Sequence, residues 1–245
     1  MYKPGKMRET SSLQSPVSKM TPPTEGMLRA MLELQDGMNR KINPEWLSAG
    51  YPFLRAVLVE AVEALDHYGW KWWKSQATDL TQLRIELIDI WHFLLSEYLV
   101  RANGDKTEAA RALLEDWRGG ASVVFDTRQY DLSTLDVREK LELLTAMAAV
   151  RRVCTPLVAD LLAASEVSAA RLFREYVSKN VLNHFRQDNG YKTGEYRKNW
   201  DGREDNVHLA QILEGLPAAD EQLPEALYRS LNDTYRRYLR EGKAV

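Results

Sequence analysis

The sequence of 245 residues has little cysteine and no long apolar run. Its single cysteine, Cys154, excludes a disulfide within the chain and fits a reducing compartment. No apolar run approaches the roughly 18 residues that a membrane-spanning helix needs, so we expect no transmembrane segment. The first residues lack the apolar core of a secretory signal. The simplest expectation is a cytoplasmic protein, with the nucleus or an organelle left open.

The sequence also lacks a large excess of charge of one sign, because it has 33 Lys and Arg and 35 Asp and Glu. A formal net charge of -2 argues against general electrostatic binding to nucleic acid. We therefore expect neither direct nucleic-acid binding nor a membrane partner. The GxxxxGK[ST] loop, the HExxH motif and Cys/His zinc spacing are all absent. Any phosphate or metal chemistry must rest on other residues.

Helical periodicity is what the sequence does contain, and no segment alternates with period two for long enough to predict a sheet. We predict an all-α fold, with residues 1–23 as a flexible tail rich in Ser, Thr, Pro and Lys and residues 24–245 as a single domain. Residues 101–134 are polar and include a short helix and a loop. The predicted helices run from Glu25, capped by Thr24, to Asn43-Pro44, then over about 52–68, 78–100, 107–117, 135–153, 157–164 and 166–187.

Two of these helices each carry a pair of acids three residues apart, Glu60 with Glu63 and Glu86 with Asp89. Positions i and i+3 share one face of a helix. No Lys or Arg stands three or four residues from any of the four acids, although a solvated helix face usually alternates in charge. The acids have mainly apolar neighbours on their own helices instead.

If the two acidic faces pack together, four like charges converge. Each close pair at about 4 Å would cost roughly 4 kcal/mol at an effective dielectric constant near 20. A cation must offset that cost, and hard oxygen ligands favour Mg²⁺, with Mn²⁺ possible. The alternative is that the two acidic faces never meet and simply face water.

Three tryptophans and two lysines follow the first acidic helix, in the stretch WKWWK over residues 70–74. These rings could stack on a planar base, while Lys71 and Lys74 meet phosphate or carboxylate. The alternative is a hydrophobic plug that closes the bundle. His92 lies one turn after Asp89, where it is either a satisfied core residue or a substrate contact.

Basic and aromatic residues gather again near the end of the helix that finishes at Asp188-Asn189-Gly190. Lys179 and Arg186 are seven apart on one helix face, and such clusters suit a polyphosphate. Alternatively the cluster is plain surface, and Glu175 at i−4 pairs with Lys179. Together, the acids and the basic cluster indicate metal-dependent hydrolysis or transfer on a phosphorylated substrate. The loop beyond this helix adds Tyr191, Lys192 and Lys198.

Several motifs at these positions resemble the dimeric all-α dUTPase family, whose pattern extends over about residues 27–210. The motifs are LQDGMN (34–39), the ExxE of VEAVEAL (59–65), GWKWWK (69–74), IELIDIWHFLLS (85–96), KNVLNHFRQDNGYKTGEY (179–196) and EDN (204–206). The resemblance implies a helical bundle of the all-α NTP pyrophosphatase type, as an intertwined homodimer. It also implies hydrolysis of dUTP, and of dUDP as a second substrate, to dUMP with release of pyrophosphate or phosphate.

The resemblance assigns roles residue by residue. Glu60, Glu63, Glu86 and Asp89 match magnesium ligands, and Glu60 would also hold the attacking water. Gln35, Asn39, Trp72 and His92 match positions near the uracil and deoxyribose. Residues expected at the phosphates or the sugar are Lys179, Arg186, Tyr191, Lys192, Lys198 and Asn206.

Two other functions compete with this one. MazG-like house-cleaning pyrophosphatases share the acid pairs but lack the tryptophan stretch, and they act on other nucleotides. A non-enzymatic helical protein could instead keep a metal site for stability alone.

Overall fold

The computed structural model describes residues 20–216 and 223–241, so most of the predicted tail and two parts of the predicted single domain, residues 217–222 and 242–245, lie outside the described residues. Within them the chain is helical, with two small antiparallel hairpins. The helices are α1 (Glu25–Ile42), α2 (Phe53–Tyr68), α3 (Leu80–Arg101), α4 (Lys106–Arg118), α5 (Val137–Ala149), α6 (Thr155–Ala164), α7 (Ala169–Asp188), α8 (Asp205–Glu214) and α9 (Leu223–Glu241). The strands are β1 (Ser122–Phe125), β2 (Arg128–Asp131), β3 (Asn199–Trp200) and β4 (Arg203–Glu204). The all-α prediction is confirmed.

Local capping explains where the site-bearing helices begin and end. Thr24 caps α1 by accepting a hydrogen bond from the backbone N–H of Met27, as predicted. α2 ends at Gly69, whose φ of 90° lies in the region that only glycine adopts readily. Asp79 then starts α3, because its carboxylate accepts from the backbone N–H groups of Thr81 and Gln82.

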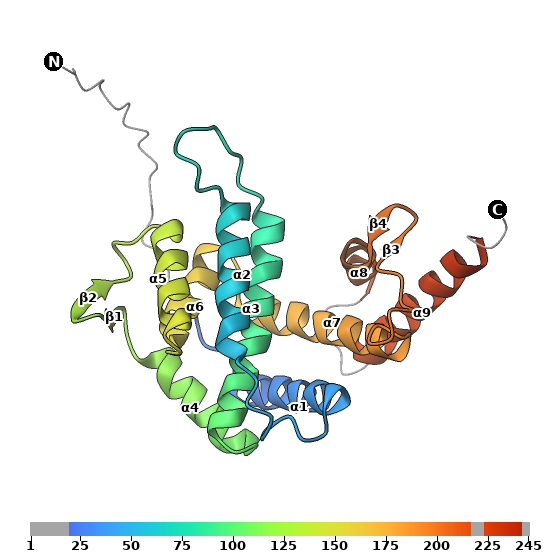
Figure 1. Cartoon of the computed structure of the whole chain (residues 1–245), viewed down its shortest axis with the longest axis horizontal. Helices are drawn as coiled ribbons and strands as arrows, with labels where there is room; N and C mark the ends of the chain where they lie inside the picture. The colour runs from blue at the N-terminus through green and yellow to red at the C-terminus, as the bar shows by residue number, and fades with distance from the viewer. Residues whose placement is uncertain (1–19, 217–222, 242–245) are drawn as a thin grey trace.

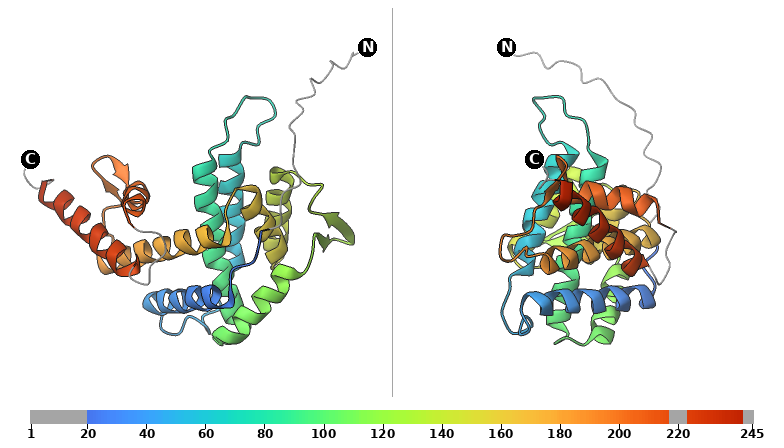
Figure 2. Two further views of the ribbon diagram at one scale, coloured as in Figure 1. Left: turned by 180° about the vertical axis from the view of Figure 1, so that it is seen from behind. Right: turned by 90° about the vertical axis from the view of Figure 1, so that its right-hand side faces the viewer.

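The helices form a bundle with one long arm. α2 packs against α3 on one side and α5 on the other, and α1 crosses near the lower end of α3 (Figure 1). α7 leaves this bundle and runs outward to α8, α9 and the β3–β4 hairpin, as the view from behind also shows (Figure 2). Residues between α2 and α3 project as a loop beyond both helices. The architecture therefore sets α3 against both α2 and the base of α7.

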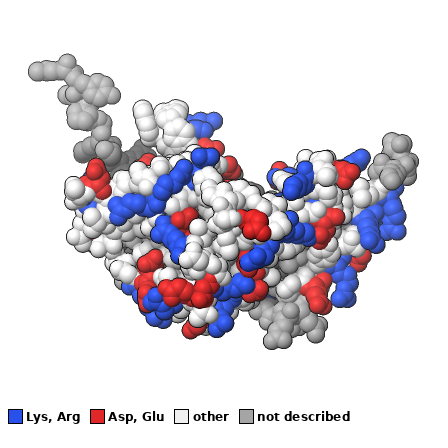
Figure 3. All heavy atoms as spheres, turned by 60° about the horizontal axis from the view of Figure 1, so that its bottom comes forward, with Lys and Arg blue, Asp and Glu red and all other residues white. Residues whose placement is uncertain are grey.

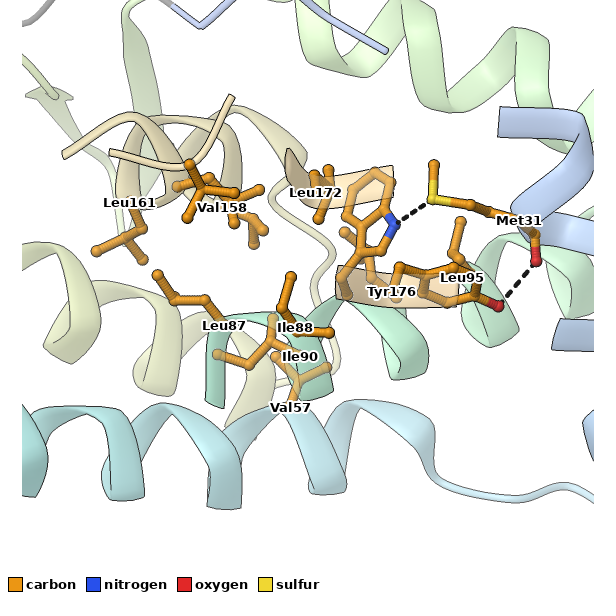
Figure 4. Packing of buried hydrophobic residues seen from close by; sticks show 14 of the residues in the cluster. Met31, Val57, Leu87, Ile88, Ile90, Leu95, Val158, Leu161, Leu172 and Tyr176 are labelled. Carbon is orange, nitrogen blue, oxygen red and sulfur yellow. Dashed lines mark hydrogen bonds between the residues drawn. The ribbon is translucent and has the colours of Figure 1, made fainter. Parts of the chain in front are cut away.

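The apolar core lies where α3 meets its neighbours. α3 is buried on most of its circumference, since Leu87, Ile90 and Leu95 all have under 1% of their surface exposed. Figure 4 shows these side chains together with Tyr176 of α7 and Met31 of α1. A helix that is apolar nearly all round must be enclosed on all sides, so the polar residues it does carry need partners from other helices.

The β1–β2 hairpin lies within the segment predicted as a polar loop. Its strands have four residues each, which is too short for a period-two pattern to be recognised. The turn is made by Asp126 and Thr127, both at positive φ. α5 is also shorter than the predicted helix over 135–153, because Asp136 caps its start and Arg151 at φ 63° lies beyond its end.

The described helices include none that is long and apolar enough to span a membrane. On the face shown in Figure 3, Lys and Arg are interspersed with Asp and Glu over the bundle and over the arm alike.

Candidate functional site

Two antiparallel helices bring the predicted acids together. One carboxylate oxygen from each of Glu60, Glu63 and Glu86 lies within 4.8 Å of the other two. Glu60 is half-buried and Glu86 is buried, whereas Glu63 is exposed. The two acidic faces therefore meet, and the alternative in which they never do is excluded for these three residues.

The electrostatics of the cluster show the cost of that convergence. Burial raises the pKa of Glu60 to about 8, and the charges of Asp89, Glu86 and Glu63 add to the effect. Burial also raises the pKa of Glu86, with Asp89 acting in the same direction and Lys179 against it. Carboxyl groups with raised pKa values in a shared site are typical of functional centres.

The fourth acid, Asp89, is held by a cation from α7. Its Oδ2 lies 2.9 Å from Lys179 Nζ, and the side chain of Lys179 is mostly buried. The intrahelical alternative for Lys179 is wrong: Glu175 pairs with Arg171, one turn in the other direction. Lys179 thus links α7 directly to the acid cluster.

Lys179 also borders a pocket of about 410 Å³ between α3, α7 and α8. Ile85, Ile88 and Leu209 contribute apolar surface to it, and Asn206 lines it from α8. The structure therefore brings two of the predicted substrate contacts, Lys179 and Asn206, to one pocket beside Asp89.

The residues predicted near the base form a second, buried cluster. Gln35 Nε2 donates to Asn39 Oδ1 at 3.1 Å, and His92 Nδ1 lies 2.9 Å from Gln35 Oε1. Two members were not predicted: Ser96, which accepts from Asn39 Nδ2 at 2.9 Å, and Tyr176, whose hydroxyl donates to Gln35 Oε1 at 3.0 Å. No pattern in the sequence identifies Tyr176 or Ser96, since the amide side chains that they contact lie on another helix, α1.

His92 is neutral in this setting. Burial lowers its pKa to about 3, and the charge of Lys179 acts in the same direction. Its ring lies on that of Tyr176, with centroids 4.3 Å apart. Its Nε2 atom is buried and has no hydrogen-bond partner among the described residues. A neutral imidazole with one free ring nitrogen could still bind a ligand donor.

The tryptophan stretch lies on the loop between α2 and α3 and is not a plug. Trp72 has 90% of its surface exposed and Trp73 57%, with their rings in edge-to-face contact. Lys71 lies near Asp66 and over the Trp70 ring, and Lys74 is exposed. The plug alternative is therefore wrong, because a plug would bury these rings in the bundle.

The other predicted phosphate contacts lie farther along α7 and beyond it. Arg186 is buried and forms two 2.8 Å hydrogen bonds to Asp205, to which Tyr196 also donates. Burial alone would lower the pKa of Arg186, but the bonds to Asp205 outweigh it and raise the value. Three further residues lie at the surface: Tyr191, Lys192 near the Ile42 carbonyl, and Lys198 near Glu204.

The donor set suits a hard divalent cation. Three carboxylates converge, and Asp89 lies close enough to raise the pKa of Glu60. Among the described residues, Lys179 forms an ion pair with Asp89, and Nε2 of His67 lies 3.5 Å from Glu86 Oε1. Carboxylate oxygens are the ligands that Mg²⁺ and Mn²⁺ prefer. The residues present therefore fit the metal that the resemblance implies.

An all-α bundle with an acidic cluster on two neighbouring helices, and with a pocket bordered by Lys179 beside it, fits the nucleotide-hydrolase class of protein. A family model described as dUTPase matches residues 27–191, which is more than half of the chain. The protein therefore belongs to the dUTPase family of all-α type, and a nucleotide is its substrate class. A search of curated proteins found no match.

Proposed function

We propose that the protein hydrolyses dUTP to dUMP and pyrophosphate with Mg²⁺ held by Glu60, Glu63, Glu86 and Asp89, and that Mn²⁺ can replace Mg²⁺. The observation that carries the proposal is the convergence of three carboxylates within 4.8 Å at a site beside Lys179, in a chain of the dUTPase family. dUDP, which has the same base, sugar and phosphoanhydride link, is the proposed second substrate.

Hydrolysis adds water across the link between the α- and β-phosphates, so that an oxygen–phosphorus bond forms as the bridging bond breaks. The divalent cation supplies charge neutralisation and a more acidic water when it is bound. Glu60, at the centre of the cluster, accepts the proton of the attacking water. The departing pyrophosphate gains negative charge, which a cation beside it stabilises.

We assign this stabilisation of the pyrophosphate to Lys179. It already holds Asp89 at 2.9 Å and borders the pocket that Asn206 shares. An ammonium that bridges an acid of the cluster and the pocket can contact a phosphate oxygen with little movement. Arg186 differs from Lys179, because its guanidinium donates twice to Asp205 and once, at 3.1 Å, to Asn183. We propose that Lys179 binds phosphate directly, while Arg186 holds the segment that carries Asn206.

Base recognition falls to the buried amide cluster. Gln35, Asn39 and His92 provide a fixed set of donors and acceptors, and mismatched base edges would leave buried polar groups unpaired. The exposed Trp72 offers a large ring on a projecting loop, which can close over the base and stack on it.

We also propose that the protein is a homodimer. The outer face of α2 exposes apolar side chains in a row, with Val59 44% and Val62 47% exposed and Tyr51 just before the helix. Grouped apolar surface of this kind is typical of a protein interface. Sedimentation equilibrium tests this: the native chain should be dimeric and Val62→Asp should shift it toward monomer. A monomeric native chain would contradict the proposal.

A substrate panel tests the function. Pyrophosphate release is measured from dUTP, dCTP, dTTP and UTP, with Mg²⁺ and then with excess chelator. We expect dUTP to be preferred and chelation to abolish turnover. Equal rates on all four would favour a house-cleaning pyrophosphatase of broader specificity.

Site variants provide the second arm of the test. Glu60→Gln and Asp89→Asn should each lower kcat by about two orders of magnitude or more while the helical circular dichroism is kept. If Glu60→Gln lowers only the melting temperature and leaves kcat unchanged, the acids form a structural metal site and the hydrolytic mechanism is wrong.

A further inference from the structure

The hydrogen bonds around Gln35 form a chain whose direction is set from its Ser96 end. At one end the hydroxyl of Ser96 donates to the backbone carbonyl of His92 at 3.1 Å. Since that hydroxyl has one hydrogen, its oxygen must accept from Asn39, which fixes Nδ2 as the atom facing Ser96. Asn39 Oδ1 then faces Gln35 and must accept from Gln35 Nε2.

The far end of the chain completes the assignment. With Nε2 of Gln35 committed to Asn39, its Oε1 accepts from both His92 Nδ1 at 2.9 Å and the hydroxyl of Tyr176 at 3.0 Å. Both lone pairs of that oxygen are thereby occupied. The imidazole must carry its proton on Nδ1, and this leaves Nε2 as the bare nitrogen.

The side chain of Tyr176 is fixed by its hydroxyl contacts, by its ring contact and by burial. Its hydroxyl shares its hydrogen with the backbone carbonyl of Met31 at 2.8 Å, the contact drawn as a dashed line in Figure 4. Its ring lies against the His92 ring, and its side chain is completely buried. Because the one hydrogen is shared between the Met31 carbonyl oxygen and Oε1 of Gln35, it points between two oxygens and favours an acceptor as the Gln35 atom that faces it.

We propose that Tyr176 is a positioning residue for base selection: with Ser96 at the other end, it holds the amides of Gln35 and Asn39 in one orientation. This rests on the proposed function, because it deepens how the same site selects uracil. In that orientation each amide keeps one N–H for a ligand, and Gln35 has no acceptor left. An N–H donor suits the carbonyl oxygen at C4 of uracil and opposes the amino group of cytosine.

Two variants with the same chemical deletion test the proposal. Tyr176→Phe removes the hydroxyl and keeps the ring on His92. The Gln35 amide then loses one hydrogen bond fewer when it turns over than it does in the native protein. We expect the ratio of kcat/KM for dUTP to that for dCTP to fall roughly fivefold, the size of one hydrogen bond. Tyr98→Phe is the control, because the buried hydroxyl of Tyr98 contacts Asp116 and Thr155, which are not part of the hydrogen-bond chain around Gln35. It should lower stability and leave the ratio unchanged.

A purely structural role for Tyr176 would lower the two kcat/KM values together, and an unchanged ratio in Tyr176→Phe would overturn the proposal. Ser96→Ala should reproduce the fall in the ratio from the opposite end.

A readout independent of turnover separates this proposal from the function itself. Long-range ¹⁵N–¹H spectra resolve the tautomers of the chain's four histidines, with His92→Gln identifying the signal of interest. We expect native His92 to be neutral with its proton on Nδ1, and the Nε2–H form would overturn the hydrogen-bond chain. If dUTP is not hydrolysed while the Nδ1–H form is present, the proposed function fails and the positioning of Gln35 stands.

Discussion

Neutralising Glu60 should raise the stability of the metal-free protein and lower its response to Mg²⁺. Coulomb's law gives about 3.5 kcal/mol for two carboxylates at 4.8 Å, the largest separation in the cluster, at an effective dielectric constant near 20. The pKa leads to a similar figure: a shift from 4.5 to about 8 costs the folded state about 3 kcal/mol at pH 7. Because water screens both figures, we expect Glu60→Gln to add about 2 kcal/mol and to raise Tm by roughly 4–8 °C.

The pH dependence of this effect has a definite sign. The folded-state pKa of Glu60 lies above its unfolded value, so the protonated group favours folding. The stability that this proton contributes is present in full below about pH 4.5 and is lost as pH rises through about 8. The difference in Tm between Glu60→Gln and the native protein should therefore be near zero at pH 4.5 and largest at pH 8.

Adding Mg²⁺ should make the native protein more stable than Glu60→Gln. A ligand at a hundred times its Kd stabilises the native protein by about 2.7 kcal/mol, and the variant, lacking one ligand, should gain much less. Differential scanning calorimetry with and without Mg²⁺ measures both shifts. Glu142→Gln is the matched control, because it removes the same charge from an exposed position on α5 and should change neither. If Glu60→Gln destabilises the metal-free protein, or responds to Mg²⁺ as the native chain does, the reasoning fails.

Three further changes have defined outcomes. Arg186→Ala leaves the fully buried Asp205 without its cation, so urea unfolding should show a loss of about 3–5 kcal/mol, and a loss below 1 kcal/mol would contradict the buried pair. Trp72→Ala should leave Tm within about 1 °C, since the ring is exposed, yet raise KM for dUTP; an unchanged KM would remove this ring from base binding. The low folded-state pKa of His92 means that the unfolded chain binds an extra proton between about pH 6.5 and 3, so its contribution to stability is present above pH 6.5 and lost as pH falls. His92→Gln should thus flatten the fall in stability over that range, and a parallel pH profile would show that His92 is not buried as a neutral group.

Much of the site could be predicted because it depends on helical spacing. Glu60 with Glu63 and Glu86 with Asp89 lie on faces set by the i, i+3 rule, and their helices are consecutive in the sequence and pack against each other. The predicted cap Thr24 likewise gave the correct start of α1. Local rules suffice wherever the partner lies on the same helix or the next one.

The remaining contacts depend on partners that local rules do not reach. Lys179 had an acid available at i−4, but Arg171 takes that acid and Lys179 binds Asp89 from α3. Arg186 finds its carboxylate 19 residues away at Asp205. Tyr176 of α7 contacts an amide of α1 that lies 141 residues away in the sequence. Such pairs follow from how helices cross, which periodicity alone does not determine.

The most direct test of the metal site is the anomalous signal of Mn²⁺ in crystals of the native protein grown with the ion and a non-hydrolysable dUTP analogue. We expect a peak within ligand distance of the carboxylates of Glu60, Glu63 and Glu86, next to the analogue's phosphates. Crystals that bind the analogue and show Mn²⁺ elsewhere, with no peak at these carboxylates, would contradict the central claim.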